Sequence, residues 1–111
     1  MKIKTQEYDD LTVIELHGEM TADFVEMLKT TVENIVSRRK PGVIIDMSQT
    51  GFIDSKGLEF LLWARDYCNE GSCAFKLAGL NENCAKILEI TQLQKEFDKY
   101  AELNAAVRSM A

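Results

Sequence analysis

Histidine, proline and cysteine are scarce in this sequence, with one, one and three copies among 111 residues. The cysteines at 68, 73 and 84 are odd in number and lack C-x-x-C spacing, so neither a disulfide framework nor a zinc site is indicated. His17 stands at the end of an expected strand without a Ser or Cys motif, which favours a structural role. A phosphate-binding G-x-x-x-x-G-K-[ST] loop is also missing, because the stretch from Gly51 to Gly57 ends in Ser-Lys-Gly. The residues therefore predict no catalytic constellation, no metal site, no cofactor and no enzyme activity.

Long apolar runs and an excess of positive charge are absent as well. No segment approaches the roughly 18 consecutive apolar residues of a membrane-spanning helix. The formal net charge is −5, whereas nucleic acids and anionic membranes both bind basic surfaces. Residues 1–7 lack the apolar core of a signal peptide. We therefore expect a cytoplasmic protein that binds no nucleic acid and does not insert into a membrane.

The composition that remains is that of a globular protein. Hydrophobic residues make up 46% of the chain and charged residues 28%, which is ordinary for a soluble domain. A chain of this length is large enough to bury one core. We expect a single domain over residues 1–111.

The most informative stretch runs from Val43 to Leu58. Its apolar, β-branched start is typical of a strand buried on both faces. Thr50-Gly51 then breaks the run, and Phe52-Ile53 is interpreted as a small apolar plug. From Asp54-Ser55 onward the spacing is helical, and both residue types are preferred helix N-caps. The stretch predicts a strand–loop–helix unit with a serine hydroxyl at the positive end of the helix.

Hydrophobic periodicity places the other elements. Strands over 2–7 and 11–17, joined by a turn at Asp9-Asp10, should form an antiparallel hairpin. A helix that ends before Pro41-Gly42 should bury one face, formed by Phe24, Met27, Leu28, Val32, Ile35 and Val36. The helix after Ser55 should run to about Asn69 and bury an arc of apolar residues, namely Leu58, Leu61, Leu62, Ala64 and Cys68, extended by Phe60 and Tyr67.

The rest of the chain predicts a strand over 74–78, a helix over 83–93, a short strand over 97–100 and a helix over 101–110. The apolar residues of the 83–93 helix are Ala85, Ile87 and Leu88. This order predicts an α/β fold with a mixed sheet of four to five strands, in which an N-terminal hairpin precedes βαβ units and about four helices cover the sheet.

The acidic pair Asp9-Asp10, followed later by Val-Ile-Ile-Asp46, is similar to the acidic site of a two-component receiver domain, which holds magnesium. A receiver needs a buried first strand that leads directly into a helix. Here the first strand is mostly polar and a second strand follows at once. A hairpin turn at Asp9-Asp10 is therefore the better interpretation.

The central stretch resembles the signature of the STAS domain family, and specifically of bacterial anti-sigma factor antagonists. The resemblance rests on Asp46-Met47-Ser48 followed by Phe52-Ile53-Asp54-Ser55-x-Gly57-Leu58, of which Asp-Ser-x-Gly-Leu is the most specific part. Supporting similarities lie at Gly18-Glu19-Met20, at 74–80 and at Leu88-x-Ile90-Thr91-x-Leu93. The resemblance covers nearly the whole chain and implies the STAS fold.

The resemblance implies a partner switch. In such proteins the serine matching Ser55 is phosphorylated by an anti-sigma factor with serine-kinase activity, and a metal-dependent phosphatase of the PP2C type removes the phosphate. The unphosphorylated form binds the anti-sigma factor and releases the sigma factor. Two alternatives stay open: a STAS subunit that binds without phosphorylation, as in lipid-transport complexes, and a phosphorylated scaffold subunit of a stress-sensing assembly.

The same resemblance implies the partner-binding residues, which we expect at Thr21, Asp23, Asp54, Ser55, Lys56, Gly57 and Glu59. This chain departs from the family at two of them. After Gly18-Glu19 the family usually has a hydrophobic residue and Asp, but this chain has Met20-Thr21, with Asp23 two places later. Lys56 replaces a residue that is often small. The other interpretation of Ser55 is an ordinary N-cap. We expect Ser55, Lys56 and Glu59 on one exposed edge, with residues 21–23 nearby.

Overall fold

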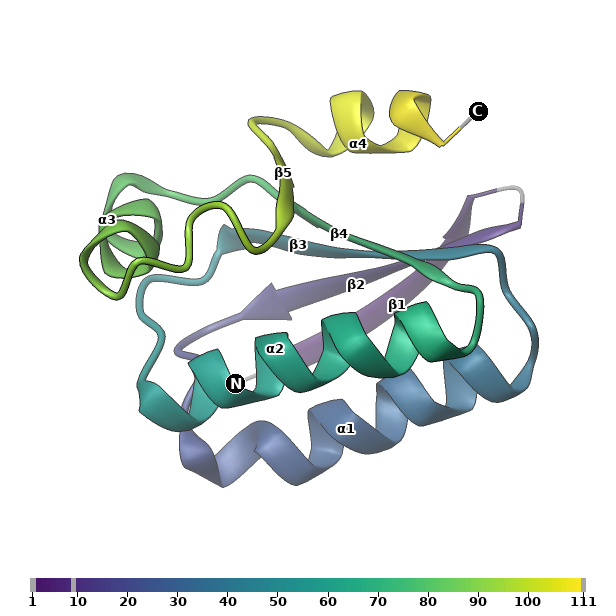
Figure 1. The fold of residues 1–111 in the computed structure, drawn as a ribbon, viewed down its shortest axis with the longest axis horizontal. Coiled ribbons are helices and arrows are strands. Elements are labelled where there is room, and N and C mark those ends of the chain that lie inside the picture. The colour runs from purple at the N-terminus through teal and green to yellow at the C-terminus, as the bar shows by residue number, and fades with distance from the viewer. Residues whose placement is uncertain (1, 9, 111) are drawn as a thin grey trace.

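The structure, a computed structural model, describes residues 2–8 and 10–110. Within them the elements follow the order β1 (Lys2–Tyr8), β2 (Leu11–His17), α1 (Ala22–Ser37), β3 (Gly42–Gln49), α2 (Ser55–Glu70), β4 (Ala74–Ala78), α3 (Glu82–Ile90), β5 (Asp98–Tyr100) and α4 (Leu103–Ser109). They form one five-stranded sheet in the order β1-β2-β3-β4-β5 (Figure 1). The predicted mixed α/β fold is confirmed.

The N-terminal hairpin is the antiparallel part of the sheet. β1 pairs antiparallel with β2, with Tyr8 opposite Leu11, and every later neighbour pair is parallel. Asp10 lies in the predicted turn, and Asp9 is outside the described residues. This hairpin rules against the receiver-like topology, in which a helix would follow the first strand directly.

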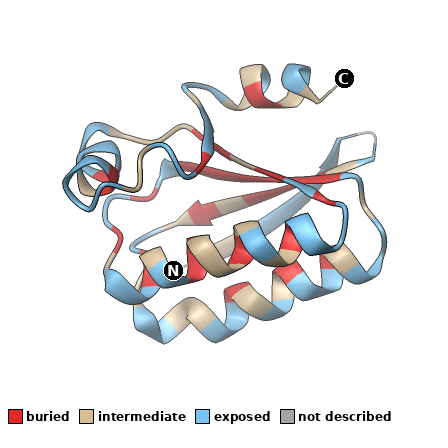
Figure 2. Cartoon of the chain, viewed as in Figure 1, coloured by how far each residue is buried: buried red, intermediate tan, exposed pale blue. Residues whose placement is uncertain are grey.

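Helices cover both faces of the sheet. α1 and α2 lie side by side on one face, and α4 lies on the other (Figure 1). The larger core lies on the α1 and α2 side, and their inward-facing positions are buried (Figure 2). A smaller cluster of Val13, Ile44, Ala78 and Ala106 lies under α4. Because both faces are covered, β3 is buried from Gly42 to Met47, as its apolar run predicted.

The buried face of α1 differs from the prediction at Met27 and at Phe24, which is only partly buried and is replaced by Val25 among the residues that pack against the core. Leu28, Val32 and Ile35 are buried, and Val25 packs against the same core. Met27, which was predicted to face inward, is 55% exposed. Successive helical residues are about 100° apart, so a stripe that contains Leu28 and Val32 leaves Met27 at its edge. In α2 the predicted arc is confirmed, with Phe60, Leu61, Ala64 and Cys68 buried.

α3 is shorter than predicted, because it ends at Ile90 rather than Leu93. Gln92 has a positive φ of 62°, and the Leu93 amide donates back to the Leu88 carbonyl at 2.8 Å. Such a left-handed residue ends a helix and lets the next amide satisfy a carbonyl of the last turn. Its inward positions also differ from the prediction, since Cys84 is buried and Ala85 is exposed.

Candidate functional site

The candidate site lies where the parallel strands end and α1 and α2 begin. Two loops meet there, residues 18–21 after β2 and residues 50–54 after β3. The Met20 amide donates to the Phe52 carbonyl at 2.9 Å, and the Asp54 amide donates to the Met20 carbonyl at 3.0 Å. Met20 and Ile53 also form a parallel β-bridge. These contacts continue the pairing of β2 with β3 and fix the two loops against each other.

Asp54 caps both helices that start at the site. It is the N-cap of α2, and its Oδ1 accepts a hydrogen bond from the Gly57 amide at 2.8 Å. Its Oδ2 accepts one from the Ala22 amide, in the first turn of α1, at 3.1 Å. Thr21, the N-cap residue of α1, makes no side-chain cap bond. A single carboxylate thus supplies acceptors to two helix N-termini, where orphan amides need them.

Ser55 is the first residue of α2 and is exposed. Because Asp54 is the cap, the interpretation of Ser55 as an ordinary N-cap is wrong. Its hydroxyl stands outside the capping arrangement, at the positive end of the helix dipole. A helix N-terminus is a favourable environment for an anion such as phosphate.

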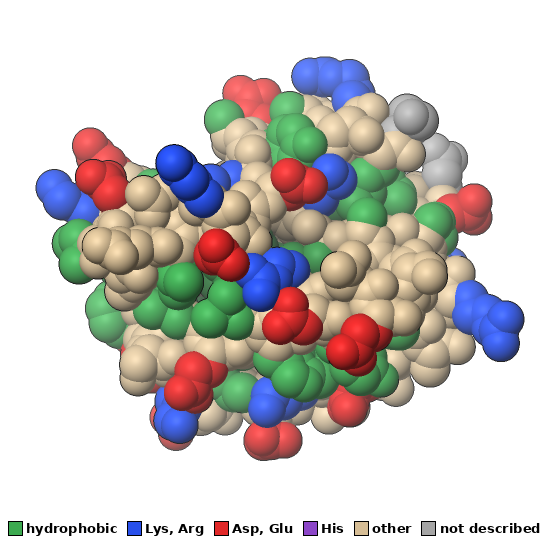
Figure 3. Space-filling view, in the orientation of Figure 1, with side chains coloured by type: hydrophobic (Ala, Val, Ile, Leu, Met, Phe, Trp, Pro, Cys, Tyr) green, Lys and Arg blue, Asp and Glu red, His purple; other side chains and the backbone are tan. Residues whose placement is uncertain are grey.

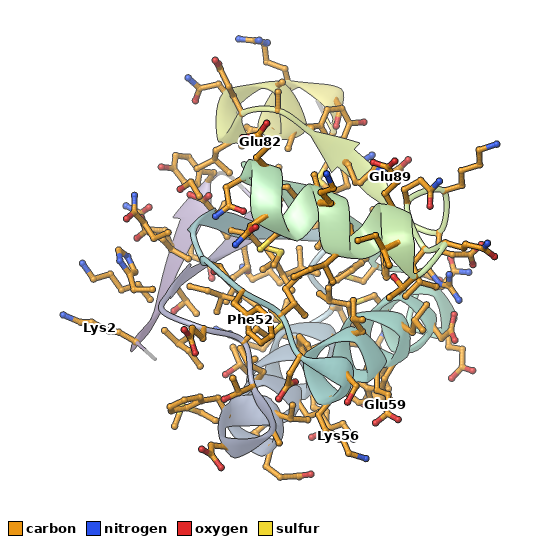
Figure 4. The ribbon with its side chains drawn as sticks, turned by 90° about the vertical axis from the view of Figure 1, so that its left-hand side faces the viewer. Lys2, Phe52, Lys56, Glu59, Glu82 and Glu89 are labelled. Atoms are coloured by element: carbon orange, nitrogen blue, oxygen red, sulfur yellow. The ribbon has the colours of Figure 1, made fainter. Side chains whose placement is uncertain are left out.

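Charged side chains of both signs surround Ser55. Lys56 and Glu59 form an ion pair at 3.2 Å, with their side chains 62% and 66% exposed. Both project from the start of α2 (Figure 4). Exposed pairs of this kind contribute little to stability, so both groups can exchange this contact for another at small cost. Figure 3 shows acidic and basic side chains interspersed over the face of the molecule that is viewed in Figure 1.

The Thr21–Asp23 segment lies beside this edge, because the Asp54–Ala22 hydrogen bond holds it there. Asp23 is exposed in the first turn of α1, and Thr21 is partly buried. A groove of about 340 Å³ separates the starts of α1 and α2, and its lining includes Val25, Lys56 and Glu59. The structure thus places Ser55, Lys56 and Glu59 close to residues 21–23, as predicted for the exposed edge. The role of these residues in binding stays a prediction.

Gly57 differs from the other residues of the predicted set because it is buried. A Cβ at this position would lie 2.7 Å from the Met20 carbonyl oxygen and 2.8 Å from Cγ2 of Ile53. Both distances are shorter than real Cβ contacts. Gly57 therefore lets α2 approach the 18–21 loop, and its own surface is not available to a partner.

Phe52 is an exposed aromatic residue that the sequence interpretation placed inside. The predicted plug is half wrong, because Ile53 is 2% exposed and Phe52 is 43% exposed. The β-bridge to Met20 turns Ile53 inward, and its neighbour in extended chain then points outward. Phe52 lies in the loop that joins β3 to α2 (Figure 4). Two adjacent apolar residues carry no signal of which one is buried.

The groups with shifted pKa values lie outside the residues that surround Ser55. Hydrogen bonds to Glu96 and Asp66 raise the pKa of Arg65, in the second half of α2. Burial raises the pKa of the Cys84 thiol, in α3. Within the described part of the chain, no cluster of three or more His, Cys, Asp or Glu is placed to hold a metal ion. Chemically, the arrangement at Ser55 presents a hydroxyl on a rigid helix start.

Comparison with known proteins gives consistent matches. A family model for the STAS domain matches residues 2–107. An anti-sigma factor antagonist from Mycobacterium paratuberculosis has a similar structure, with a TM-score of 0.87 and 21% identity, covering 98% of this chain and 92% of that one. The Bacillus cell fate determinant SpoIIAA in its phosphorylated form matches with a TM-score of 0.76 and 16% identity, covering 99% and 100%.

The same fold occurs in a protein of another kind. A sulfate transporter family protein from Wolinella succinogenes has a TM-score of 0.83 and 14% identity, covering 93% of this chain and 86% of that one. For this chain, none of the helices in residues 2–8 and 10–110 is long and apolar enough to cross a membrane. At these identities the structural matches establish the fold.

Proposed function

Because the chain belongs to the STAS domain family, we propose that it is an anti-sigma factor antagonist that acts by partner switching. The observation that carries the proposal is the exposed Ser55 at the start of α2, next to an aspartate that already caps the helix. A serine that is not needed as the cap can be modified without loss of the helix start. Similar folds in an anti-sigma factor antagonist and in phosphorylated SpoIIAA support this assignment.

The proposed cycle has two states. The unphosphorylated form binds an anti-sigma factor with serine-kinase activity, which then releases its sigma factor. The kinase transfers the γ-phosphoryl group of ATP to the Ser55 hydroxyl, so that the oxygen loses its proton and forms a bond to phosphorus, with ADP as the other product. A PP2C-type phosphatase hydrolyses this ester and restores the hydroxyl. The catalytic groups belong to the partners, and this chain is their substrate and ligand.

The local charges explain how phosphate would change binding but not the fold. Phosphorylation adds a charge of about −1.5 to −2 at one oxygen, and the α2 N-terminus favours it. The same charge falls close to the carboxylate of Asp54 and one helical turn from Glu59. A partner surface shaped for a hydroxyl between these groups would have to accept extra volume and extra negative charge. Unpaired or repelled polar groups in an interface weaken binding strongly.

The experiment that tests the proposal is phosphorylation by candidate kinases in the presence of ATP, with the phosphate located by mass spectrometry. We expect phosphate on Ser55 and none on Ser55→Ala. Ser48→Ala is the matched control, because Ser48 is also exposed and lies at the end of β3. Phosphate on Ser48, Thr50 or Ser72 instead would overturn the assignment. In titration calorimetry, Ser55→Ala should bind the kinase persistently with ATP present, and Ser55→Asp weakly; equal affinities would rule out an electrostatic switch.

A second candidate function is a STAS subunit that binds its partner without phosphorylation. The similar fold of the Wolinella sulfate transporter family protein favours it, and lipid-transport complexes are a related setting. A phosphorylated scaffold subunit of a stress-sensing assembly is a variant of the first proposal. A neighbouring gene for a small GHKL-type kinase would favour the switch, whereas neighbouring transporter genes would favour the second candidate.

A further inference from the structure

Asn81 joins the start of α3 to the 50–54 loop, which directly precedes Ser55. It is the N-cap of α3, and its Oδ1 accepts a hydrogen bond from the Cys84 amide at 2.8 Å. Its Nδ2 donates to the Thr50 carbonyl at 2.9 Å. The two bonds use both the oxygen and the nitrogen of the side-chain amide. Because the oxygen accepts the cap bond, the nitrogen must face the loop. The side chain therefore couples the start of α3 to the first residue of the 50–54 loop.

Thr50 is a buried anchor of that loop. It is 0% exposed, and its hydroxyl donates to the Leu16 carbonyl at 3.3 Å. Besides Asn81, its carbonyl accepts from the Cys84 thiol at 3.3 Å. A thiol is a weak donor. Without the Asn81 amide the buried carbonyl would thus lose its strong partner, which penalises the present loop conformation.

The 50–54 loop is also held from its other side, by hydrogen bonds to the 18–21 loop. The amides of Met20 and Asp54 form the hydrogen bonds between the two loops. On the α3 side, Asn83 adds a longer, exposed bond from its Nδ2 to the Gly51 carbonyl at 3.4 Å. Asn81 is therefore the better placed of the two asparagines to fix the loop, since its bond is shorter and partly buried.

We infer that Asn81 is a positioning residue for Ser55, which acts by holding the 50–54 loop in the conformation that presents the serine. It does not touch the reacting atoms. The effect on phosphorylation rests on the proposed function, whereas the effect on the loop does not. If the competent loop conformation is only partly populated, the apparent affinity for the kinase falls by that fraction.

The test variant is Asn81→Ser. Serine is a good N-cap, so α3 keeps its start, but the shorter side chain has no amide to donate to Thr50. Asn83→Ser makes the same chemical change in the first turn of α3 and serves as the matched control. Leu88→Ala, in the buried face of α3, controls for a general loss of stability without removing a loop bond.

The first measurement is native-state amide hydrogen exchange, which reports local opening. In Asn81→Ser the amides of Met20 and Asp54 should exchange at least about tenfold faster than expected from the change in global stability. In Asn83→Ser they should stay within about twofold of the unmodified protein, and in Leu88→Ala they should follow global unfolding. Unchanged exchange at both amides in Asn81→Ser would overturn the inference without any kinase.

The second measurement is steady-state phosphorylation of Ser55. Asn81→Ser should raise the KM for this protein about fivefold or more, with kcat within about twofold. Leu88→Ala should leave KM unchanged at temperatures where it is folded. A KM for Asn81→Ser equal to that of the unmodified protein would show that the loop contact does not position Ser55. If no kinase modifies the unmodified protein at Ser55, the proposed function fails, while the exchange data still decide the role of Asn81.

Discussion

The carboxylate of Asp54 accepts a hydrogen bond at 3.1 Å from the backbone amide of Ala22, which lies 32 positions earlier in the chain. Its other oxygen accepts one from Gly57 at 2.8 Å. The starts of α1 and α2 are thereby tied to one side chain, directly before Ser55. This arrangement explains how the edge formed by the 21–23 segment and the start of α2 keeps a fixed shape.

Loss of one or of both acceptor oxygens of Asp54 should destabilise the fold by different amounts. Asp54→Asn keeps one acceptor oxygen and should lose about 1 kcal/mol, whereas Asp54→Ala loses both and should lose about 2 kcal/mol, because one N-cap is worth about 0.5–2 kcal/mol. Urea denaturation measures both changes. Asp23→Asn, which removes an exposed charge from the first turn of α1, is the control and should cost roughly 0.5 kcal/mol. Equal losses for the Asn and Ala variants would contradict the double cap.

Charge at Ser55 and volume in the core should affect stability very differently. Ser55→Asp places a carboxylate at a helix N-terminus and should change the free energy of unfolding by about 1 kcal/mol or less. Leu61→Ala removes a fully buried side chain and should cost about 2–5 kcal/mol. Thermal and urea denaturation of both variants checks this. A similar loss in the free energy of unfolding for the two variants would mean that position 55 does not accept a carboxylate without loss of stability.

The exposed charge of Glu59 should matter for binding and not for folding. Glu59→Lys leaves the buried face of α2 untouched and breaks only an exposed ion pair, so the free energy of unfolding should change by about 0.5 kcal/mol or less. Binding to the anti-sigma partner should weaken, as measured by titration calorimetry. Glu82→Lys makes the same charge change in α3, away from Glu59 (Figure 4), and is the control. If both variants bind like the unmodified protein, the interface lies elsewhere.

A side chain at Gly57 should be poorly tolerated. In Gly57→Ala the new methyl group would lie 2.7 Å from the backbone oxygen of Met20, which cannot move without displacing the 18–21 loop. Such overpacking costs about 1–3 kcal/mol. Gly51→Ala is the matched control, because its new methyl group would have no packing neighbour within 4 Å. Comparable denaturation midpoints for the two variants would argue against the close approach at Gly57.

The three cysteines should react at different rates with iodoacetamide. A hydrogen bond from Cys68 lowers the pKa of the Cys73 thiol, although burial opposes it, and Cys73 lines a cavity of about 400 Å³. The bond to Cys73, together with burial, raises the pKa of Cys68, and burial raises that of Cys84. Because the thiolate is the nucleophile, Cys73 should be alkylated first at pH 8. Mass spectrometry at short times identifies the site, and faster labelling of Cys84 would contradict this order.

The architecture could be predicted because its signals are local. The apolar run from Val43 indicates a strand covered on both faces, and helical spacing after Ser55 indicates α2 and its buried arc. The order of strands and helices then constrains the sheet. Residues at the margins of these patterns were less well predicted, as Met27 and the end of α3 show. Whether such a residue is buried, or still helical, depends on the few residues next to it and on what they pack against.

The site divides along the same line. A serine at the start of a helix after a buried strand could be predicted from the sequence alone, since hydrophobic spacing and cap preference act within a few residues. The folded structure was needed to show that Asp54 also caps α1, that Ile53 points inward and Phe52 outward, and that Asn81 holds Thr50. Each of these depends on a backbone group far away in the chain, at Ala22, Met20 or Thr50. Periodicity carries no information about such partners, because they become neighbours only when the sheet brings its loops together.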